Sequence, residues 1–414
     1  MVTFLHTADW QIGMTRRWLQ PEAQARFDHD RLMAIRAAGR IAREQGCAFV
    51  VVAGDVFESN QLRQGTVRRA LDAMGEIALP VYLLPGNHDP LDAVSIYRQP
   101  TFVGACPSNV TVLDSEGPYD VADGVQIIAA PWRGKHPGRD LVAAALAGVG
   151  PADDTIRVLV GHGGVDVLDP SGRSPAAIDT TGLVGAVRRG QIHYVALGDR
   201  HSRTDVGGHG CIWYSGTIEV TDPREETPGE VLVVELARDS PPQVVSHRTG
   251  TWDFRTLTRD LNSTQDVDRF IAELDAVSGK EKVVLKVALR GGLTLADYAR
   301  LQEALEGLQT TFAGLREWDR HTDLVIIPDE QQWSQMSISG YVDRAAEEIR
   351  LRMSESGVHD DRDRPAGEDR QDLPTGETDS GARASLYDPD RADDADSARD
   401  ALALLFRLSG APTR

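Results

Sequence analysis

The chain lacks long apolar runs and paired cysteines, and each absence excludes a class of protein. No segment approaches the roughly 20 consecutive apolar residues of a membrane-spanning helix, so we expect no membrane association. The three cysteines lie far apart and form no C-x-x-C pair, which argues against a disulfide scaffold or a thiolate metal site. Reduced cysteines and the lack of an export-type leader predict a cytoplasmic protein.

The chain also lacks a phosphate-binding loop motif and has few lysines. The phosphate-loop pattern G-x-x-x-x-G-K-[ST] does not occur, so we expect no ATP-driven activity from this chain alone. Lysine occurs only at 135, 280, 282 and 286, and the net charge of −19 weighs against a nucleic-acid partner. However, residues 354–400 hold fifteen Asp and Glu against six Arg, so nearly half of the negative excess lies in one segment.

Five short apolar runs each end in side chains that can bind a metal ion. They occupy residues 3–11, 49–55, 81–89, 158–162 and 194–201. Their apolar parts are rich in Val, Leu and aromatic residues, as is typical of strands buried on both faces. In layered α/β folds, ligands bind outside the carboxyl ends of the strands. Five such strand ends at one edge predict a preorganised metal site.

The apolar periodicity predicts a layered α/β domain over residues 1–250, followed by a smaller module. In the first domain we expect helices over 24–45 and 64–77, and further strands over 124–130, 212–214 and 231–236. In the module, over 251–335, we expect an α+β fold with helices over 266–277 and 295–308 and strands over 282–289 and 323–327.

The C-terminal part reads differently. We expect a helix within 336–353 and a short amphipathic helix within 398–414. Between them, residues 354–397 are acidic and almost free of large apolar groups, which predicts a disordered linker because such a segment cannot offset its ordering entropy.

The polar clusters have the chemistry of a two-metal phosphoesterase site. Asp9 and Asp55 follow consecutive strands, and a carboxylate shared by two cations holds them roughly 3.5–4 Å apart. An amide (Asn87) and two imidazoles (His162 and His201) complete an oxygen and nitrogen donor set, which favours Mn²⁺, Fe²⁺, Zn²⁺ or Mg²⁺.

Two residues beside this set have an expected role in proton transfer. His88 is placed to protonate a leaving oxygen, and Asp89 is expected to fix the tautomer of its ring.

These motifs resemble those of the calcineurin-like metallophosphoesterases. They read Asp9-x-Gln11, Gly54-Asp55, Gly86-Asn87-His88-Asp89, Gly161-His162 and Gly198-Asp199-Arg200-His201. The resemblance implies a β-sandwich flanked by helices. By the same resemblance one metal would take Asp9, Gln11, Asp55 and His201, and a second would take Asp55, Asn87, His162 and Asp199.

The sequence around the motifs resembles that of the SbcD-type DNA-repair nucleases. The similar segments are His6-Thr-Ala-Asp-Trp10 and Gly54-Asp-Val-Phe57. This similarity implies a 3′–5′ exonuclease and single-strand endonuclease of DNA double-strand-break repair. It also implies that residues 251–335 are a DNA-binding capping domain. The implied partners are DNA, an SbcC-type SMC-like ATPase subunit and a second copy of the chain.

The chain departs from the family pattern at two positions where the family has histidine. Gln11 offers a weaker amide ligand, and Asp199 adds a negative charge that shifts the expected metal toward Mn²⁺. Because of these changes, two other functions stay open. One is a phosphodiesterase for small molecules or cyclic nucleotides, and the other is a DNA-end-binding scaffold with impaired catalysis. Gln11 itself is either a ligand or a spectator.

Overall fold

The computed structural model describes residues 1–16, 18–168, 174–327 and Glu348. They divide into two units, the first comprising Met1–Arg255 with Gly279–Val284 and the second Thr256–Ser278 with the residues from Leu285 onward. Sequence alone placed this boundary at 250. Apart from Glu348, the segments expected over 336–353, 354–397 and 398–414 lie outside the described residues.

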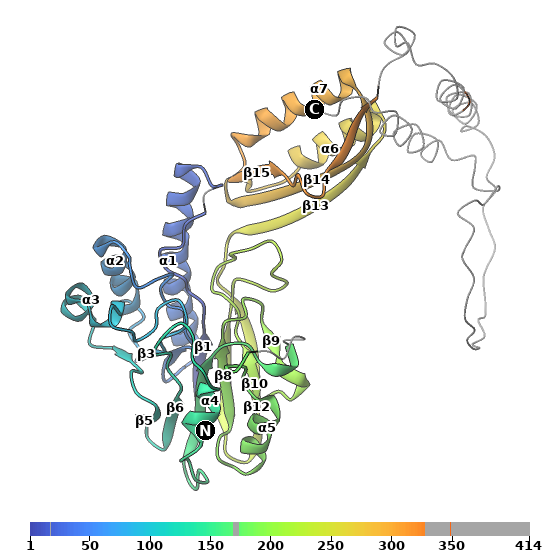
Figure 1. Ribbon diagram of the computed structural model, residues 1–414. Coiled ribbons are helices and arrows are strands. Elements are labelled where there is room, and N and C mark those ends of the chain that lie inside the picture. The colour runs from blue at the N-terminus through green and yellow to red at the C-terminus, as the bar shows by residue number, and fades with distance from the viewer. Residues whose placement is uncertain (17, 169–173, 328–347, 349–414) are drawn as a thin grey trace, which may run out of the picture. The chain divides into compact units, whose positions relative to one another are not determined.

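Two six-stranded sheets form the centre of the first unit (Figure 1). The first sheet has the order β12-β11-β1-β2-β3-β4. Its strands are β1 (Val2–Thr7), β2 (Val50–Val52), β3 (Val81–Leu83), β4 (Val110–Val112), β11 (Glu230–Ala237) and β12 (Ser240–Arg248). The strands β1 to β4 pair in parallel, whereas β11 pairs antiparallel with β1 and β12.

The second sheet has the order β5-β6-β7-β8-β10-β9. Its strands are β5 (Gly117–Ala122), β6 (Val125–Ala129), β7 (Ile156–His162), β8 (Tyr194–Gly198), β9 (Thr204–Asp205) and β10 (Ile212–Tyr214). The strands β6, β7, β8 and β10 are parallel. The carboxyl ends of β7 and β8 therefore lie at one edge of this sheet.

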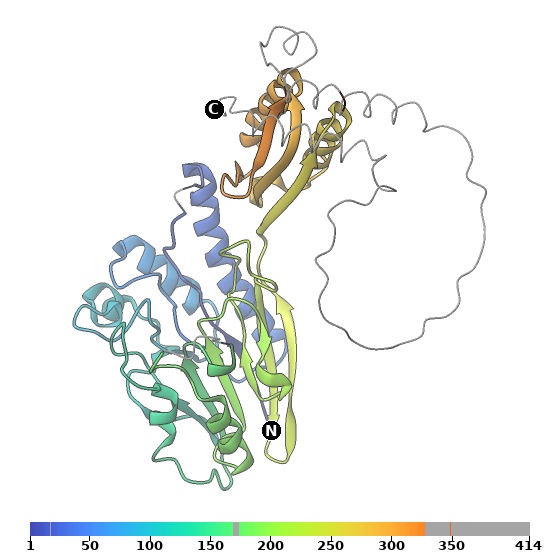
Figure 2. The same ribbon diagram turned by 45° about the vertical axis from the view of Figure 1, so that its right-hand side comes forward.

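The helices of the first unit cover the outer faces of the two sheets. They are α1 (Pro21–Glu44), α2 (Gln64–Gly75), α3 (Pro100–Ala105), α4 (Leu141–Leu146) and α5 (Thr180–Arg188), with 3₁₀ turns η1 (Ile96–Arg98), η2 (Asp166–Leu168), η3 (Val206–Gly208) and η4 (Lys280–Lys282). Both views show α1 and α2 side by side (Figures 1 and 2). Pro21 starts α1 at the position where a missing N–H costs nothing.

Alternation along the strands creates three apolar cores in this unit. In β1, Phe4 faces the core between the sheets, whereas Leu5 packs under α1 and α2. In β7, Val158 faces the same central core and Leu159 packs against α4 and α5. The result is a four-layer α/β/β/α sandwich, which confirms the layered α/β fold expected from the sequence.

His6 of β1 connects the two sheets inside the central core. Its Nδ1 lies 3.1 Å from the Tyr194 hydroxyl and its Nε2 lies 3.2 Å from the Leu197 carbonyl, both on β8. Burial lowers the pKa of His6 to about 3, although the Leu197 carbonyl opposes this shift, so the ring is neutral. His6 is therefore a residue of the core and not of the ligand motifs.

The second unit is an α+β module. It contains the helices α6 (Thr264–Asp275) and α7 (Leu295–Gln309) and a four-stranded sheet with the order β13-β14-β15, in which β16 also pairs with β14. The strands are β13 (Asp253–Leu261), β14 (Val283–Thr294), β15 (Gly314–Glu317) and β16 (Asp323–Ile327). Among the described residues, no helix is long and apolar enough to cross a membrane.

Candidate metal centre

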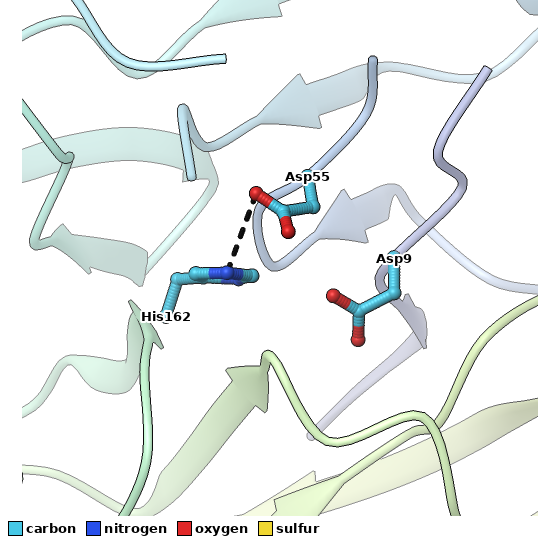
Figure 3. Close-up of side chains that lie close together, drawn as sticks. All are labelled: Asp9, Asp55 and His162. Carbon is cyan, nitrogen blue, oxygen red and sulfur yellow. Dashed lines mark ion pairs between the residues drawn. The ribbon is translucent and has the colours of Figure 1, made fainter. Parts of the chain in front are cut away.

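Three buried side chains converge where strands of the two sheets end. Asp9 follows β1, Asp55 follows β2 and His162 is the last residue of β7, and one ligand atom of each lies within 4.8 Å of the others. Figure 3 shows the Asp55 and Asp9 carboxylates beside the His162 ring, and His162 Nε2 lies 3.4 Å from Asp55 Oδ1. These residues could hold a metal ion.

Backbone strain is concentrated at the predicted ligands. In the described part of the chain, six non-glycine residues have a positive φ, and four of them are Asp9 (51°), Gln11 (41°), Asp55 (52°) and Asp199 (99°). Such a conformation costs on the order of 1–3 kcal/mol per residue and persists only where the surroundings enforce it. Here hydrogen bonds enforce it, from Asp9 N to the Gly54 carbonyl (3.1 Å) and from Gln11 N to the Asp55 carbonyl (2.9 Å). The fold therefore maintains strain that presents these side chains at the sheet edge.

Two glycines allow His162 to approach the turns. A Cβ on Gly54 would lie 2.1 Å from His162 Nδ1, and a Cβ on Gly198 would lie 2.0 Å from the Ala53 carbonyl oxygen. No side chain fits at these distances. The Gly-Asp pairs of the sequence motifs thus combine a close approach of the chain with a strand-end carboxylate.

The His162 ring is fixed so that Nε2 faces the carboxylates. Its Nδ1 lies 2.9 Å from the Ala53 carbonyl oxygen and must donate to it. Nε2 then points to the Asn87 amide at 2.8 Å and lies 3.8 Å from Asp199 Oδ1. Burial alone lowers the pKa of His162, but Asp55 and then the other carboxylates outweigh it and raise the pKa well above its ordinary value. A cation bound by these carboxylates would compete with that proton.

The two buried carboxylates of the centre differ in their pKa. Burial raises the pKa of Asp9 to about 7, against the opposing charges of His201 and His162. Burial also raises the pKa of Asp55, but His162 outweighs it, so the pKa of Asp55 is lowered overall. Asp9 accepts the Asp199 N–H at 3.0 and 3.1 Å, which joins the turns after β1 and β8. Two carboxylates buried side by side are typical of a site that binds a cation.

The ring of His201 is oriented in the same way as that of His162, but by the Glu225 carboxylate in place of a backbone carbonyl. Its Nδ1 lies 2.8 Å from both Glu225 Oε1 and Thr221 Oγ1. Because a carboxylate can only accept, Nδ1 carries the proton and Nε2 faces Gln11, whose Nε2 is 3.0 Å away. Metal-binding histidines commonly donate their other N–H to a carboxylate or a backbone carbonyl. Both His162 and His201 satisfy this condition.

Gln11 brings a polar atom that the described residues leave unpaired. Its side chain is 3% exposed, and Oε1 is buried with no hydrogen-bond partner among them. Burial of an unpaired oxygen costs about 1–3 kcal/mol. A cation or a water bound to Oε1 would remove this cost, so the unpaired oxygen is compatible with the ligand alternative.

The Asn87 amide lies among acceptor atoms. One of its terminal atoms lies 2.8 Å from His162 Nε2 and 3.1 Å from each Asp55 oxygen. With nitrogen on that side, its two hydrogens are shared among these three atoms; with oxygen on that side, the amide offers a further ligand beside the same carboxylate. Asn87 is thus placed next to the carboxylate that sequence identified as the shared ligand.

His88 sits at the border of the centre and the solvent. Its backbone N–H donates to Asp55 Oδ1 at 3.0 Å, and its ring Nδ1 lies 3.0 Å from the Glu58 carbonyl oxygen. Nε2 lies 4.0 Å from Asp55 Oδ2, and the side chain is 38% exposed. The ring can therefore meet a bound substrate through Nε2, as leaving-group protonation requires.

Asp89 has a different role from the one expected. Its oxygens accept from Gly86 N at 2.7 Å, Phe57 N at 2.9 Å and the Tyr97 hydroxyl at 2.6 Å. The expected pairing with the His88 ring is thus corrected, because these donors occupy Asp89 and a backbone carbonyl orients His88. Burial raises the pKa of Asp89 to about 6, and the hydrogen bonds oppose this shift. Asp89 positions the turn that carries Asn87.

Six of the seven predicted ligands thus lie in the buried cluster or in contact with a member of it, and His201 is joined to them through Gln11. Sequence reasoning missed Glu225, Thr221 and the Ala53 carbonyl, which orient the imidazoles. Glu225 belongs to no metal motif, and only the fold brings it to His201. Ala53 contributes a backbone atom, which side-chain patterns do not reveal.

Comparison with known proteins gives one family and remote structural likenesses. Residues 2–203 match the calcineurin-like phosphoesterase family. The chain is 11% identical to TT1561 of Thermus thermophilus, over 60% of this chain and 99% of that one, with a TM-score of 0.38. It is 14% identical to a dimetal phosphatase from Danio rerio, over 59% and 98% of the two chains, also with a TM-score of 0.38. No curated protein matches.

The donor chemistry at the strand ends and the family match agree with each other. Carboxylate, amide and imidazole groups are the ligands of hard and borderline divalent cations. Over residues 2–203, this chain is thus similar to the calcineurin-like phosphoesterases, and its donor set is of the kind that binds divalent metal ions.

Proposed function

We propose that the chain is a metal-dependent DNA nuclease of the SbcD type, acting as a 3′–5′ exonuclease and single-strand endonuclease in double-strand-break repair. One observation carries the chemistry. The Asp55 carboxylate is approached by His162 Nε2 at 3.4 Å, by the Asn87 amide at 3.1 Å and by the His88 N–H at 3.0 Å. This central position suits a carboxylate shared by two ions.

The proposed ligand sets are those that the resemblance to the calcineurin-like metallophosphoesterases implies. Asp9, Gln11, Asp55 and His201 would hold one ion, and Asp55, Asn87, His162 and Asp199 the other. When bound, two divalent ions supply charge neutralisation at the phosphate and a water of lowered pKa. Four of the seven ligands are oxygen donors from carboxylates or amides of the first sheet, and Asp199 adds a fifth, so we propose Mn²⁺.

The residues of the chain prepare the rest of the reaction. Ala53 and Glu225 hold Nδ1–H of the two histidines, so that both Nε2 atoms stay available. His88 donates Nδ1–H to the Glu58 carbonyl, which leaves Nε2 to carry the transferable proton. As water oxygen bonds to phosphorus and the P–O bond breaks, this proton passes to the leaving oxygen.

The choice of DNA over a small molecule is supported by the sequence around the motifs and by the second unit. The segment His6-Thr-Ala-Asp-Trp10 is similar in sequence to the SbcD-type nucleases. The α+β module of β13 to β16 supplies none of the proposed ligands, and a minimal cyclic-nucleotide enzyme has no need of it. We propose that this module is the DNA-binding cap.

An SbcC-type ATPase is the proposed partner, because SbcD-type nucleases work with such a subunit and the chain itself has no phosphate loop. The candidate docking segments, 336–353 and 398–414, lie outside the described residues. Deletion of residues 354–414 should abolish co-purification with the ATPase if the last segment docks there. Unchanged co-purification would confine docking to the preceding segment or to the module.

The function is tested by offering several substrates to the purified protein with Mn²⁺. Labelled duplex DNA, single-stranded DNA, cyclic nucleotides and bis(p-nitrophenyl) phosphate are incubated in parallel, with and without chelator. We expect chelator-sensitive cleavage of DNA. Cleavage of cyclic nucleotides alone would establish the small-molecule alternative, and DNA binding without any hydrolysis would establish the scaffold alternative.

A further inference from the structure

A basic loop follows β6 at the same sheet edge as the candidate metal centre. We define it as residues 133–139, and it contains Arg133, Lys135, His136 and Arg139. Because β6 runs parallel to β7, which ends at His162, the carboxyl ends of both strands lie together. Trp132, directly before the loop, donates from Nε1 to the His162 carbonyl at 2.7 Å. The loop thus begins one residue from a contact with a proposed metal ligand.

Side chains of the loop line a surface hollow of about 500 Å³. The lining carries two guanidinium groups and one imidazole against a single carboxylate, that of Glu116. Arg139 Nη2 lies 3.2 Å from that carboxylate, and Arg133 Nη2 donates to the Asp114 carbonyl at 3.1 Å. Each of these contacts occupies one of the five N–H donors of a guanidinium. Both arginines are exposed, so further donors can meet an anion in the hollow.

The charge of the loop stands out in this chain. The whole sequence has a net charge of −19 and four lysines, yet these seven residues hold three permanent positive charges and no carboxylate. The next residue, Asp140, caps α4 by accepting from Val142 N and Ala143 N at 2.8 and 2.9 Å. The hydrogen bonds of the nearest acidic side chain along the chain therefore go to α4 and to the Asp179 N–H, and not to the arginines of the loop.

We infer that the basic loop is a subsite for a second phosphate of the substrate, beside the phosphate that is cleaved. The inference rests on the proposed function and specifies its substrate as a polynucleotide strand. A strand carries a negative charge about every 3.4 Å along the helix axis, so a strand cleaved at the centre brings further phosphates to its rim. Arginine binds phosphate through paired N–H donors. A cyclic nucleotide has one phosphate, which the metal centre takes, and it leaves the loop without a ligand.

The experiment compares two double variants of the full chain. The test variant is Arg133→Ala with Arg139→Ala. The control is Arg40→Ala with Arg188→Ala, which removes the same charge from exposed positions. Arg40 lies in the last turns of α1 and Arg188 ends α5, and each helix there leads into the start of the next strand. The control positions are therefore at the opposite edge from the metal centre.

Binding of a fluorescein-labelled single-stranded oligonucleotide is measured by anisotropy in EDTA at several salt concentrations. The test variant should bind more weakly, and its slope of log K against log salt should be smaller by about two, one for each phosphate that the two arginines no longer bind. The control should match the wild type. Hydrolysis of bis(p-nitrophenyl) phosphate with Mn²⁺ should stay within about twofold of wild type in both variants, because this substrate has one phosphate.

Each other outcome has a definite meaning. A wild-type protein that does not bind the oligonucleotide, or a test variant with unchanged affinity and slope, overturns the subsite. Equal weakening in the control overturns it too, since general charge would then explain binding. If the wild type hydrolyses bis(p-nitrophenyl) phosphate but leaves DNA intact, the nuclease proposal fails, and the binding comparison still decides the subsite.

Discussion

The Nδ1 atom of His162 lies 2.9 Å from the carbonyl oxygen of Ala53, and this contact decides which ring nitrogen faces Asp55. Ala53 stands two residues before Asp55, at the end of β2. The backbone that presents the central carboxylate therefore also orients the imidazole opposite it. The fold therefore orients both groups without the help of an ion.

Asp55→Asn should abolish hydrolysis and lower the bound metal from two ions to one or none per chain. The amide keeps the shape of the side chain but removes the charge that two ions would share. Metal content by plasma mass spectrometry and the rate on bis(p-nitrophenyl) phosphate are the measurements. A variant with wild-type metal content and rate would show that the two-metal assignment is wrong.

His88→Ala should lower the turnover of DNA by about 10²–10⁴-fold, the usual contribution of a positioned proton donor. Metal content should stay at the wild-type level, because the proposed role of His88 is protonation and not coordination. The loss should be smaller on bis(p-nitrophenyl) phosphate, whose leaving group needs little protonation. Equal losses on both substrates, or loss of metal, would remove His88 from this role.

Gln11→His should tighten Mn²⁺ binding at one of the two sites, and Gln11→Ala should weaken it. The reason is that imidazole is a stronger ligand than the amide oxygen, which is buried without a partner among the described residues. Calorimetric titration of metal-free protein measures both variants. Titrations that match the wild type in both would establish Gln11 as a spectator.

Glu225→Gln should weaken metal binding by about 10–100-fold, the range usual for partners of metal-bound histidines. The carboxylate that accepts from His201 Nδ1 at 2.8 Å would become an amide, which no longer fixes the tautomer by charge. Glu226→Gln is a matched control, since it changes the neighbouring residue by the same chemical step. Wild-type metal affinity in the Glu225 variant would limit this residue to a structural role.

The pH dependence of stability can be assigned to Asp9 by comparison with Asp9→Asn. The pKa of Asp9 is raised from 3.8 to about 7, chiefly by burial, so the folded state binds this proton more tightly than the unfolded state. In EDTA, the wild type should therefore lose stability relative to the variant as pH rises from about 4 to about 7. Mn²⁺ should reverse this trend by stabilising the ionised form. Denaturant unfolding at several pH values measures it, and a pH-independent difference would contradict it.

Sequence alone predicted the parts of the fold that periodicity encodes. The strands Ile212–Tyr214 and Asp323–Ile327 were expected at these positions, and α1 and α7 within a few residues of their observed ends. The edge strand β12 was missed because it is polar and contains two prolines, which are tolerated only at an edge. The short helix α4 was missed because six apolar residues do not separate a helix from a strand.

The candidate site could be predicted only at the level of residue type and strand order. Parallel strands bring their carboxyl ends together, so the gathering of Asp9, Asp55 and His162 followed from the motifs. The hydrogen-bond partners of Asp89 could not be predicted in this way. Its carboxylate accepts from three donors and not from the ring of the adjacent His88. This choice of donors depends on packing, and the sequence spacing of His88 and Asp89 suggested the wrong pair.

The contact of His6 with Tyr194 and Leu197 bears on which natural variants of this chain keep their activity. Each proposed ion takes ligands from both sheets, so the centre exists only while the sheets keep one alignment. His6 holds that alignment from the core and touches no ion. Natural variants that keep every proposed ligand but lose His6 should therefore be inactive. Their motif residues alone would wrongly suggest an active enzyme.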